Sequence, residues 1–316
     1  MSEQTGGTIQ SAAPLRASGP GGSIYDLGYQ GYTGPRLGRS HALRALFYHT
    51  IRACYGIGRG GRAKIAPFAF GALALIPAVI GVGIAALAKQ AGELGSFVEE
   101  ASPINYAGYY ELVSTMLVLF CAVQAPELLG RDQRYGVLPV YFSRALERID
   151  YAVAKIAGLV VSLLIVILLP YLVLFAGRVL VADSPVEGLT EELPNLLPII
   201  ATSLLTAGLL GTLSMVISAF TPRRAYATVG VIAALTIPAI VIGILYEPLV
   251  RNGWEAVSLL SPAEVLGGVN ATMFGRPVDP FEDVIRLPAL AYVGAALAWI
   301  VVAVTLTIRR YLKITA

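Results

Sequence analysis

Ionisable side chains are rare in the long apolar stretches of this 316-residue chain, which limits the chemistry that these stretches can perform. Glu111 is the only Asp, Glu, Lys or Arg within these stretches. Such a residue inside a membrane-spanning segment is a functional candidate by default. Glu111 is expected about 8 Å below the outer membrane boundary, at ~1.5 Å of rise per residue. It is therefore a candidate for a gate or for a charge at the outer interface, and one buried acid does not make a proton relay.

ATP hydrolysis by this chain is excluded by the positions of its lysines. A P-loop requires Gly-Lys-Ser/Thr, because the lysine must reach the phosphates. The lysines are Lys64, Lys89, Lys155 and Lys313, and none of them follows a glycine. Any ATP and Mg²⁺ used with this protein are therefore expected on another subunit.

The histidines and cysteines do not form a metal motif or a disulfide framework. His41 and His49 are eight residues apart, which suits no metal-ligand spacing. Cys54 and Cys121 are the only cysteines and are expected to be ordinary buried thiols. We expect no catalytic residue, cofactor site or metal site in this chain.

Composition indicates a membrane protein. Hydrophobic residues make up 56% of the chain and charged residues 14%, against about 25% charged residues in a soluble domain. A membrane helix needs about 20 apolar residues to cross ~30 Å of hydrocarbon. Six stretches qualify: Ala66–Ala88, Tyr106–Pro126, Ile156–Ala176, Leu196–Phe220, Ala225–Tyr246 and Leu287–Ile308.

The distribution of basic residues predicts the orientation. Of the 23 Lys and Arg residues, 18 lie before the first stretch, in the loops after the second and fourth stretches, or in the C-terminal tail. Basic residues concentrate on the cytoplasmic side of membrane proteins. The sequence therefore predicts an all-α membrane protein with six transmembrane helices and with its N and C termini in the cytoplasm. The apolar stretch 66–88 is too long for a signal peptide, so it is expected to remain in the mature protein.

Three segments outside the six stretches have distinct compositions. Residues 1–39 are rich in glycine and small or polar residues, which predicts an irregular, disordered cytoplasmic segment, and residues 40–316 form the transmembrane domain. From Ser40, a plausible N-cap, apolar and basic residues alternate at helical spacing, which predicts an amphipathic interfacial helix. The outer loop 247–286 is too charged to span and is expected to contain short helices.

The loop 127–155 carries the most specific pattern. It combines apolar residues with basic ones, as a docking surface between two membrane helices would. The apolar set is Leu138, Val140, Tyr141, Phe142 and Leu146, and the basic set is Arg144, Arg148 and Lys155. Charge alone favours a solvated loop that obeys the positive-inside rule.

The order of residues in this loop resembles that of ABC-2-type transporter permeases, whose pattern is G-T-L-P-L-L-L-S-R-P-L-S-R-x-x-Y-x-x-A-K. The matching residues are Gly136, Leu138, Pro139, Ser143, Arg144, Leu146, Arg148, Tyr151, Ala154 and Lys155, with Glu127 at the place of the family's acidic residue. Val137 and Ala145 depart from the pattern. Segment 24–62 also resembles the segment that precedes the first membrane span in many bacterial members of this family.

The resemblance implies a permease subunit in a bacterial plasma membrane, working with a separate ATP-binding subunit and a second permease copy in a homodimer or heterodimer. Coupling to the ATP-binding subunit is then expected at Glu127, Gly136, Leu138, Arg144, Arg148, Tyr151 and Lys155. A mostly apolar path favours a hydrophobic or amphipathic substrate, and the resemblance implies that it is exported. A membrane scaffold that transports nothing, or an ion-coupled carrier, remains the alternative. The lipid bilayer is an expected partner and nucleic acid is not.

Overall fold

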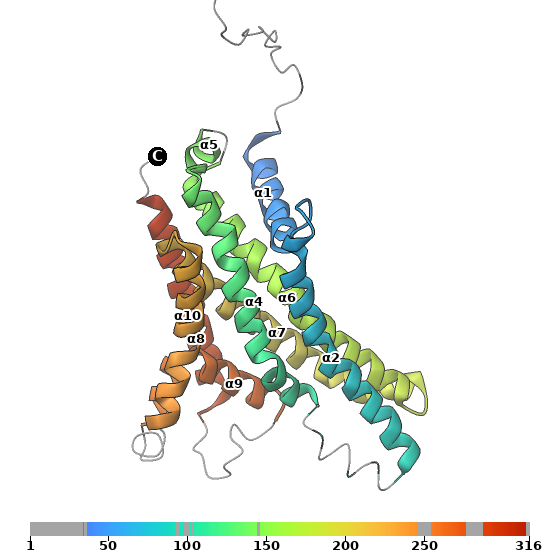
Figure 1. Ribbon diagram of the computed structural model, residues 1–316. Coiled ribbons are helices and arrows are strands. Elements are labelled where there is room, and N and C mark those ends of the chain that lie inside the picture. Colours follow the sequence, from blue (N-terminus) through green and yellow to red (C-terminus); the bar gives the residue numbers. More distant parts are fainter. Residues whose placement is uncertain are drawn as a thin grey trace, which may run out of the picture. The chain divides into compact units, whose positions relative to one another are not determined.

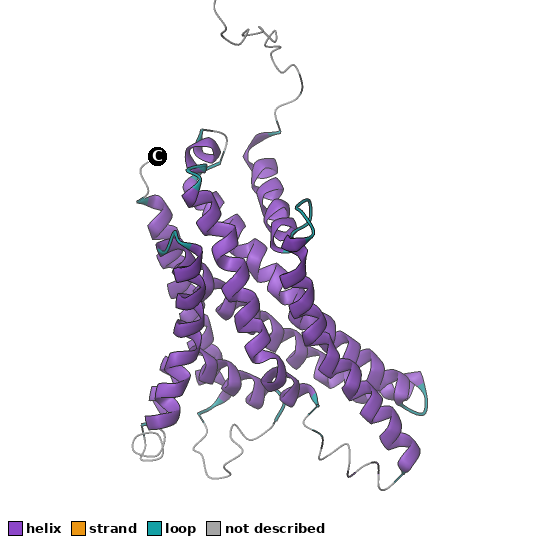
Figure 2. Ribbon diagram, in the orientation of Figure 1, coloured by secondary structure: helices purple, strands orange, loops and turns teal. Residues whose placement is uncertain are grey.

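The computed structural model describes residues 34, 37–92, 95, 97, 102, 104–143, 146–245, 254–275 and 287–313. Within these residues all regular structure is helical (Figures 1 and 2). The elements are α1 (Gly38–Cys54), α2 (Arg62–Ala91), α4 (Tyr106–Arg134), α5 (Leu138–Phe142), α6 (Arg148–Val181), α7 (Pro185–Phe220), α8 (Arg224–Leu245), the 3₁₀ helix η2 (Glu255–Leu260), α9 (Pro262–Met273) and α10 (Ala289–Leu312).

Six of these helices are long and apolar enough to cross a membrane, namely α2, α4, α6, α7, α8 and α10. The prediction of an all-α membrane protein is thus confirmed, and the chain is a multi-pass membrane protein. Helices satisfy every backbone group internally, as the hydrocarbon requires. The helices extend beyond the predicted spans because hydropathy detects only their apolar part: α4 continues to Arg134, α6 begins at Arg148, and α7 begins at Pro185.

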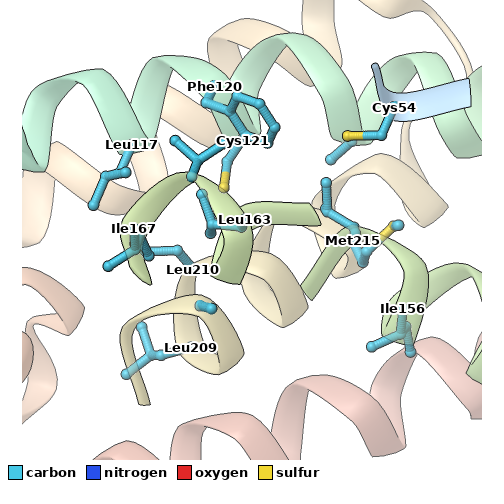
Figure 3. Packing of buried hydrophobic residues seen from close by; sticks show 14 of the residues in the cluster. Cys54, Leu117, Phe120, Cys121, Ile156, Leu163, Ile167, Leu209, Leu210 and Met215 are labelled. Carbon is cyan, nitrogen blue, oxygen red and sulfur yellow. The ribbon is translucent and has the colours of Figure 1, made fainter. Parts of the chain in front are cut away.

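Helices α4 and α7 are the most buried of the six, whereas α2, α8 and α10 leave most of their apolar surface open. The core between α4, α6 and α7 contains Phe120, Cys121, Leu163, Ile167 and Leu210, which point toward one another (Figure 3). No hydrophobic effect drives helices together in lipid, so close van der Waals packing must hold this centre.

Helix α1 lies against α6 and contributes Leu46, Thr50 and Cys54 to the buried core. The Tyr55 hydroxyl donates a hydrogen bond of 2.8 Å to the carbonyl of Ser162 on α6. Gly158 of α6 allows α1 to approach closely, because a Cβ built at Gly158 would lie 2.5 Å from the Thr50 methyl group. The predicted N-cap at Ser40 is wrong, because α1 begins at Gly38 and Leu37 occupies the cap position without a side-chain hydrogen bond.

Both cysteines are buried in the native fold, and burial raises the pKa of the Cys54 thiol to about 12. Because the thiolate is the nucleophile, we expect neither cysteine to react with N-ethylmaleimide at pH 7 in mild detergent, and both to react after denaturation. Intact-mass measurement of the labelled protein counts the adducts. Rapid addition of one adduct to the native protein would show that α1 does not occupy its position on α6.

At the opposite end of the bundle from α5, the short helices η2 and α9 lie in the predicted outer loop (Figure 1). Asn270 of α9 is buried, and its Nδ2 donates a hydrogen bond of 2.6 Å to the carbonyl of Ala107 on α4. The Trp299 Nε1 donates a bond of 3.1 Å to the carbonyl of Leu259 at the end of η2. These bonds fix both short helices to membrane-spanning ones.

Candidate functional site: the basic end of the bundle

Glu127 joins three segments that are distant in the sequence. Its carboxylate lies 2.8 Å from Arg59 Nη1 in the α1–α2 turn, 3.3 Å from Arg224 Nη1 at the start of α8, and 3.8 Å from Arg131 on its own helix α4. One acid thus pairs with basic groups from three elements at the end of the bundle where basic residues gather. That this end faces the cytoplasm stays a prediction from the charge distribution.

Lys155 of α6 forms a more deeply buried ion pair with Asp132 of α4. Their Nζ and Oδ2 atoms are 2.7 Å apart, and the side chains are only 4% and 15% exposed. Lys155 Nζ also donates to the carbonyl of Leu128 at 3.2 Å, and the Tyr151 hydroxyl donates to Asp132 at 2.7 Å. Tyr151 and Lys155 reach the same partner because residues four apart share one helix face. A buried charge pair of this kind is stable only when such additional hydrogen bonds complete it.

The ring of Tyr151 connects this ion pair to α5 and α10. Its centroid lies 5.4 Å from that of Tyr141, 6.0 Å from that of Phe142 and 5.2 Å from that of Tyr311. Gln133 Nε2 donates to the Tyr311 hydroxyl at 3.0 Å and to the carbonyl of Ala219 on α7 at 3.1 Å. The ends of α4, α6, α7 and α10 are therefore linked around Tyr151.

Gly136 ends α4 and turns the chain into α5. Its φ of 62° lies in the left-handed region that favours glycine. The N–H of Gly136 donates to the carbonyl of Gln133, and the N–H of Val137 donates to that of Asp132. These two bonds form a Schellman motif, which satisfies the last carbonyls of a helix. The glycine-led pattern of the sequence thus has a local structural cause.

The remaining predicted coupling residues have different surroundings. Leu138 is buried, as is Leu146, so these two leucines pack into the core on either side of α5. Arg148 Nη1 donates to the carbonyl of Leu312 at the end of α10 at 3.1 Å. Arg144 lies outside the described residues. Within the described part of the loop, Pro139, Val140 and Ser143 are exposed.

A groove of about 620 Å³ lies between α5, the start of α6 and the end of α10. Its charges come from Glu147 and Arg148, and its apolar lining comes from Pro139, Phe142, Leu146, Ile149 and Leu312. We call it the α5 groove. It is open at the basic end of the bundle, next to the aromatic contacts of Tyr151.

Several partners in this region were not identified from sequence. Arg39 Nε lies 2.7 Å from Asp150 Oδ2, and the same guanidinium contacts Glu147, so the N-terminus of α1 is tied to the N-terminus of α6. The hydrogen bond to Asp150 raises the pKa of Arg39. Glu147 and Asp150 also form a capping box for α6. The three-residue spacing of two acids before a long apolar run is the sequence signal for that cap.

Glu111 lies far from this network, in the second turn of α4, and is exposed. The ordered charges of the outer end lie elsewhere: the Tyr106 hydroxyl donates to Glu192 at 2.7 Å, and Arg178 Nη1 lies 3.7 Å from the same carboxylate. Glu111 remains a candidate for a gate or an interface charge.

Within the described part of the chain, no three His, Cys, Asp or Glu residues lie close enough together to hold a metal ion. Neither a protein-family model nor a curated protein matches this sequence. The geometry of the site consists of ion pairs, hydrogen bonds and aromatic contacts that join the helix ends. The short helix α5 packs against these helix ends.

Proposed function

We propose that this chain is the permease subunit of an ABC-2-type transporter in a bacterial plasma membrane, as its loop resemblance implies. A separate subunit would bind and hydrolyse ATP, and a second permease copy would complete the transport path. Both chain ends would face the cytoplasm. The cargo class that fits the apolar spans is a hydrophobic or amphipathic molecule, moved outward.

This proposal rests on the way in which α5 is held against the membrane-spanning helices. This helix of five residues follows the rigid Gly136 turn, and Tyr141 and Phe142 contact Tyr151 of α6. A partner that pushes on α5 would therefore act directly on the ends of α4 and α6. The Lys155–Asp132 pair and the Glu127 contacts would carry that displacement to the neighbouring helices, because packed elements shift as units.

The same observation favours a transporter over a scaffold. A scaffold needs only an exposed surface, whereas here the exposed helix is coupled to buried charges between spans. An ion-coupled carrier would be expected to use ionisable groups near the middle of its spans, and Glu111 lies near one end of α4.

We expect Ile149→Asp to reduce capture of the ATP-binding subunit about tenfold, which corresponds to about 1.4 kcal/mol. Ile149 lines the α5 groove and is 40% exposed, so an acid there alters the docking surface. An acid in the first turn of α6 suits the helix dipole and should leave folding intact. The measurement is a detergent pull-down from native membranes, with ATPase activity assayed in the eluate.

Ile149→Leu is the matched control and should retain full capture. This pair of variants is cleaner than charge reversal at Arg148, which would also break the contact with Leu312. Equal recovery of ATPase activity with Ile149→Asp and Ile149→Leu would place docking elsewhere. Recovery of the wild-type chain with no ATP-binding protein at all would favour the scaffold or the carrier.

A further inference from the structure

A second groove of about 830 Å³ lies between α1, the α1–α2 turn, the end of α4 and the start of α5. We call it the basic groove. Its ionisable lining residues are His49, Arg52, Arg59, Glu127, Arg131, Asp132 and Lys155. It is separate from the α5 groove, since the two share no lining residue.

The basic groove is electropositive because its cations outnumber its acids and the acids are already engaged. Glu127 is shared by Arg59 and Arg131, and Asp132 is held by Lys155 and the Tyr151 hydroxyl. Arg52 is an exposed cation on the wall formed by α1.

His49 also lines the groove, and the neighbouring positive charges affect its pKa. Burial lowers its pKa most, and the charges of Lys155, Arg59 and Arg52 lower it further, against a smaller opposing effect of Asp132. An anion entering the groove would encounter an attractive field from several sides.

The basic groove lies at the level where the apolar stretches of α4 and α6 end. Leu128 lies just after the apolar stretch 106–126 of α4, and Lys155 lies just before the apolar stretch 156–176 of α6. Lipid phosphates lie at this level, where the hydrocarbon ends. The walls also carry exposed apolar side chains, Ile57 at 46% and Val140 at 59% exposure. Nearby, the ring of Phe68, 57% exposed near the start of α2, lies 6.1 Å from that of Tyr55.

We propose that the basic groove binds the phosphate headgroup of an anionic phospholipid of the cytoplasmic leaflet. Arg52 and Arg131 would contact the phosphate from opposite walls, and the exposed apolar residues would contact the start of the acyl chains. Anionic lipids are attracted to basic segments next to membrane spans. An acidic protein segment would match the charges but not the apolar walls at membrane depth.

The test is native mass spectrometry of the purified full-length chain titrated with dioleoyl-phosphatidylglycerol, dioleoyl-phosphatidylcholine or inorganic phosphate. Wild-type protein should retain phosphatidylglycerol at least about tenfold better than phosphatidylcholine, and the double variant Arg52→Gln/Arg131→Gln should lose that preference. The double variant Arg62→Gln/Arg134→Gln removes the same charge outside the groove and should keep it. A thermal melt of both variants checks that the fold persists.

Four outcomes would overturn the proposal. These are equal retention of the two lipids by wild-type protein, equal loss of preference in the two double variants, retention of inorganic phosphate as strong as that of phosphatidylglycerol, and loss of ATP-binding subunit capture with unchanged lipid retention. The last would assign the groove to a protein contact. Because lipid retention is measured without any partner, its failure leaves the docking proposal untouched.

Discussion

Asp132→Asn is expected to destabilise the protein by about 3 to 5 kcal/mol, because it leaves the Lys155 ammonium buried without its counter-charge. Asparagine keeps an oxygen that can accept the Tyr151 hydrogen bond, so the variant tests the charge itself. A loss of this size should lower the melting temperature in detergent by on the order of 10 °C. Heating followed by size-exclusion chromatography would measure the fraction that remains monodisperse.

The control for this prediction is Arg134→Gln, on the same end of α4, where an exposed charge should contribute less than about 1 kcal/mol. A second variant, Asp132→Asn with Lys155→Met, removes both charges. It should recover most of the lost stability, because an uncompensated charge costs more than a neutral pair. Equal melting of Asp132→Asn and the wild type would mean that the pair is hydrated and contributes little to joining α4 to α6.

Gly158→Leu is expected to displace α1 from α6, because even the first carbon of the new side chain would lie 2.5 Å from the Thr50 methyl group. Overpacking of this kind typically costs about 1 to 3 kcal/mol. Leucine favours both helix and membrane, so α6 should still insert. The readout is the Cys54 thiol: its reaction with N-ethylmaleimide should accelerate on the order of tenfold or more as burial is lost.

Gly71→Leu provides the matched control, since a Cβ at Gly71 of α2 meets nothing within 4 Å. It should leave Cys54 as unreactive as in the wild type. Unchanged reactivity in Gly158→Leu would show that α6 adapts to the larger side chain and that α1 keeps its place. If α1 does move, binding of phosphatidylglycerol should weaken in the same variant, because α1 forms one wall of the basic groove.

The sequence predicted which segments are helical spans far better than where the helices end. Uninterrupted apolar stretches identify membrane helices because lipid permits little else. Hydropathy does not detect amphipathic extensions, so α7 begins at Pro185 and not at Leu196. Ser40 does not cap α1: a serine before an apolar pattern is a common cap, but this helix starts earlier, at Gly38.

The candidate site was predictable only in its local parts. Gly136 and the apolar residues of α5 are neighbours in sequence, and their pattern predicted a docking surface of mixed apolar and basic residues in this loop. The partners of Glu127 were not predictable, because Arg59 lies 68 residues away and Arg224 comes from another helix. A single sequence carries no signal for which of many arginines will meet one acid. The pairing depends on how the spans pack.

The lengths of α6 and α7 have a mechanical consequence. At 34 and 36 residues, these adjacent helices are each about 50 Å long, whereas the hydrocarbon is about 30 Å thick. The parts of α6 and α7 next to the connection at residues 182–184 lie outside the apolar stretches 156–176 and 196–220, so they extend beyond the hydrocarbon. Because α6 and α7 are packed along each other, a rotation at the Lys155 end would be expected to displace their far tip as well. Asp183 at this tip lies 3.0 Å from Lys89, so such a displacement would reach the end of α2.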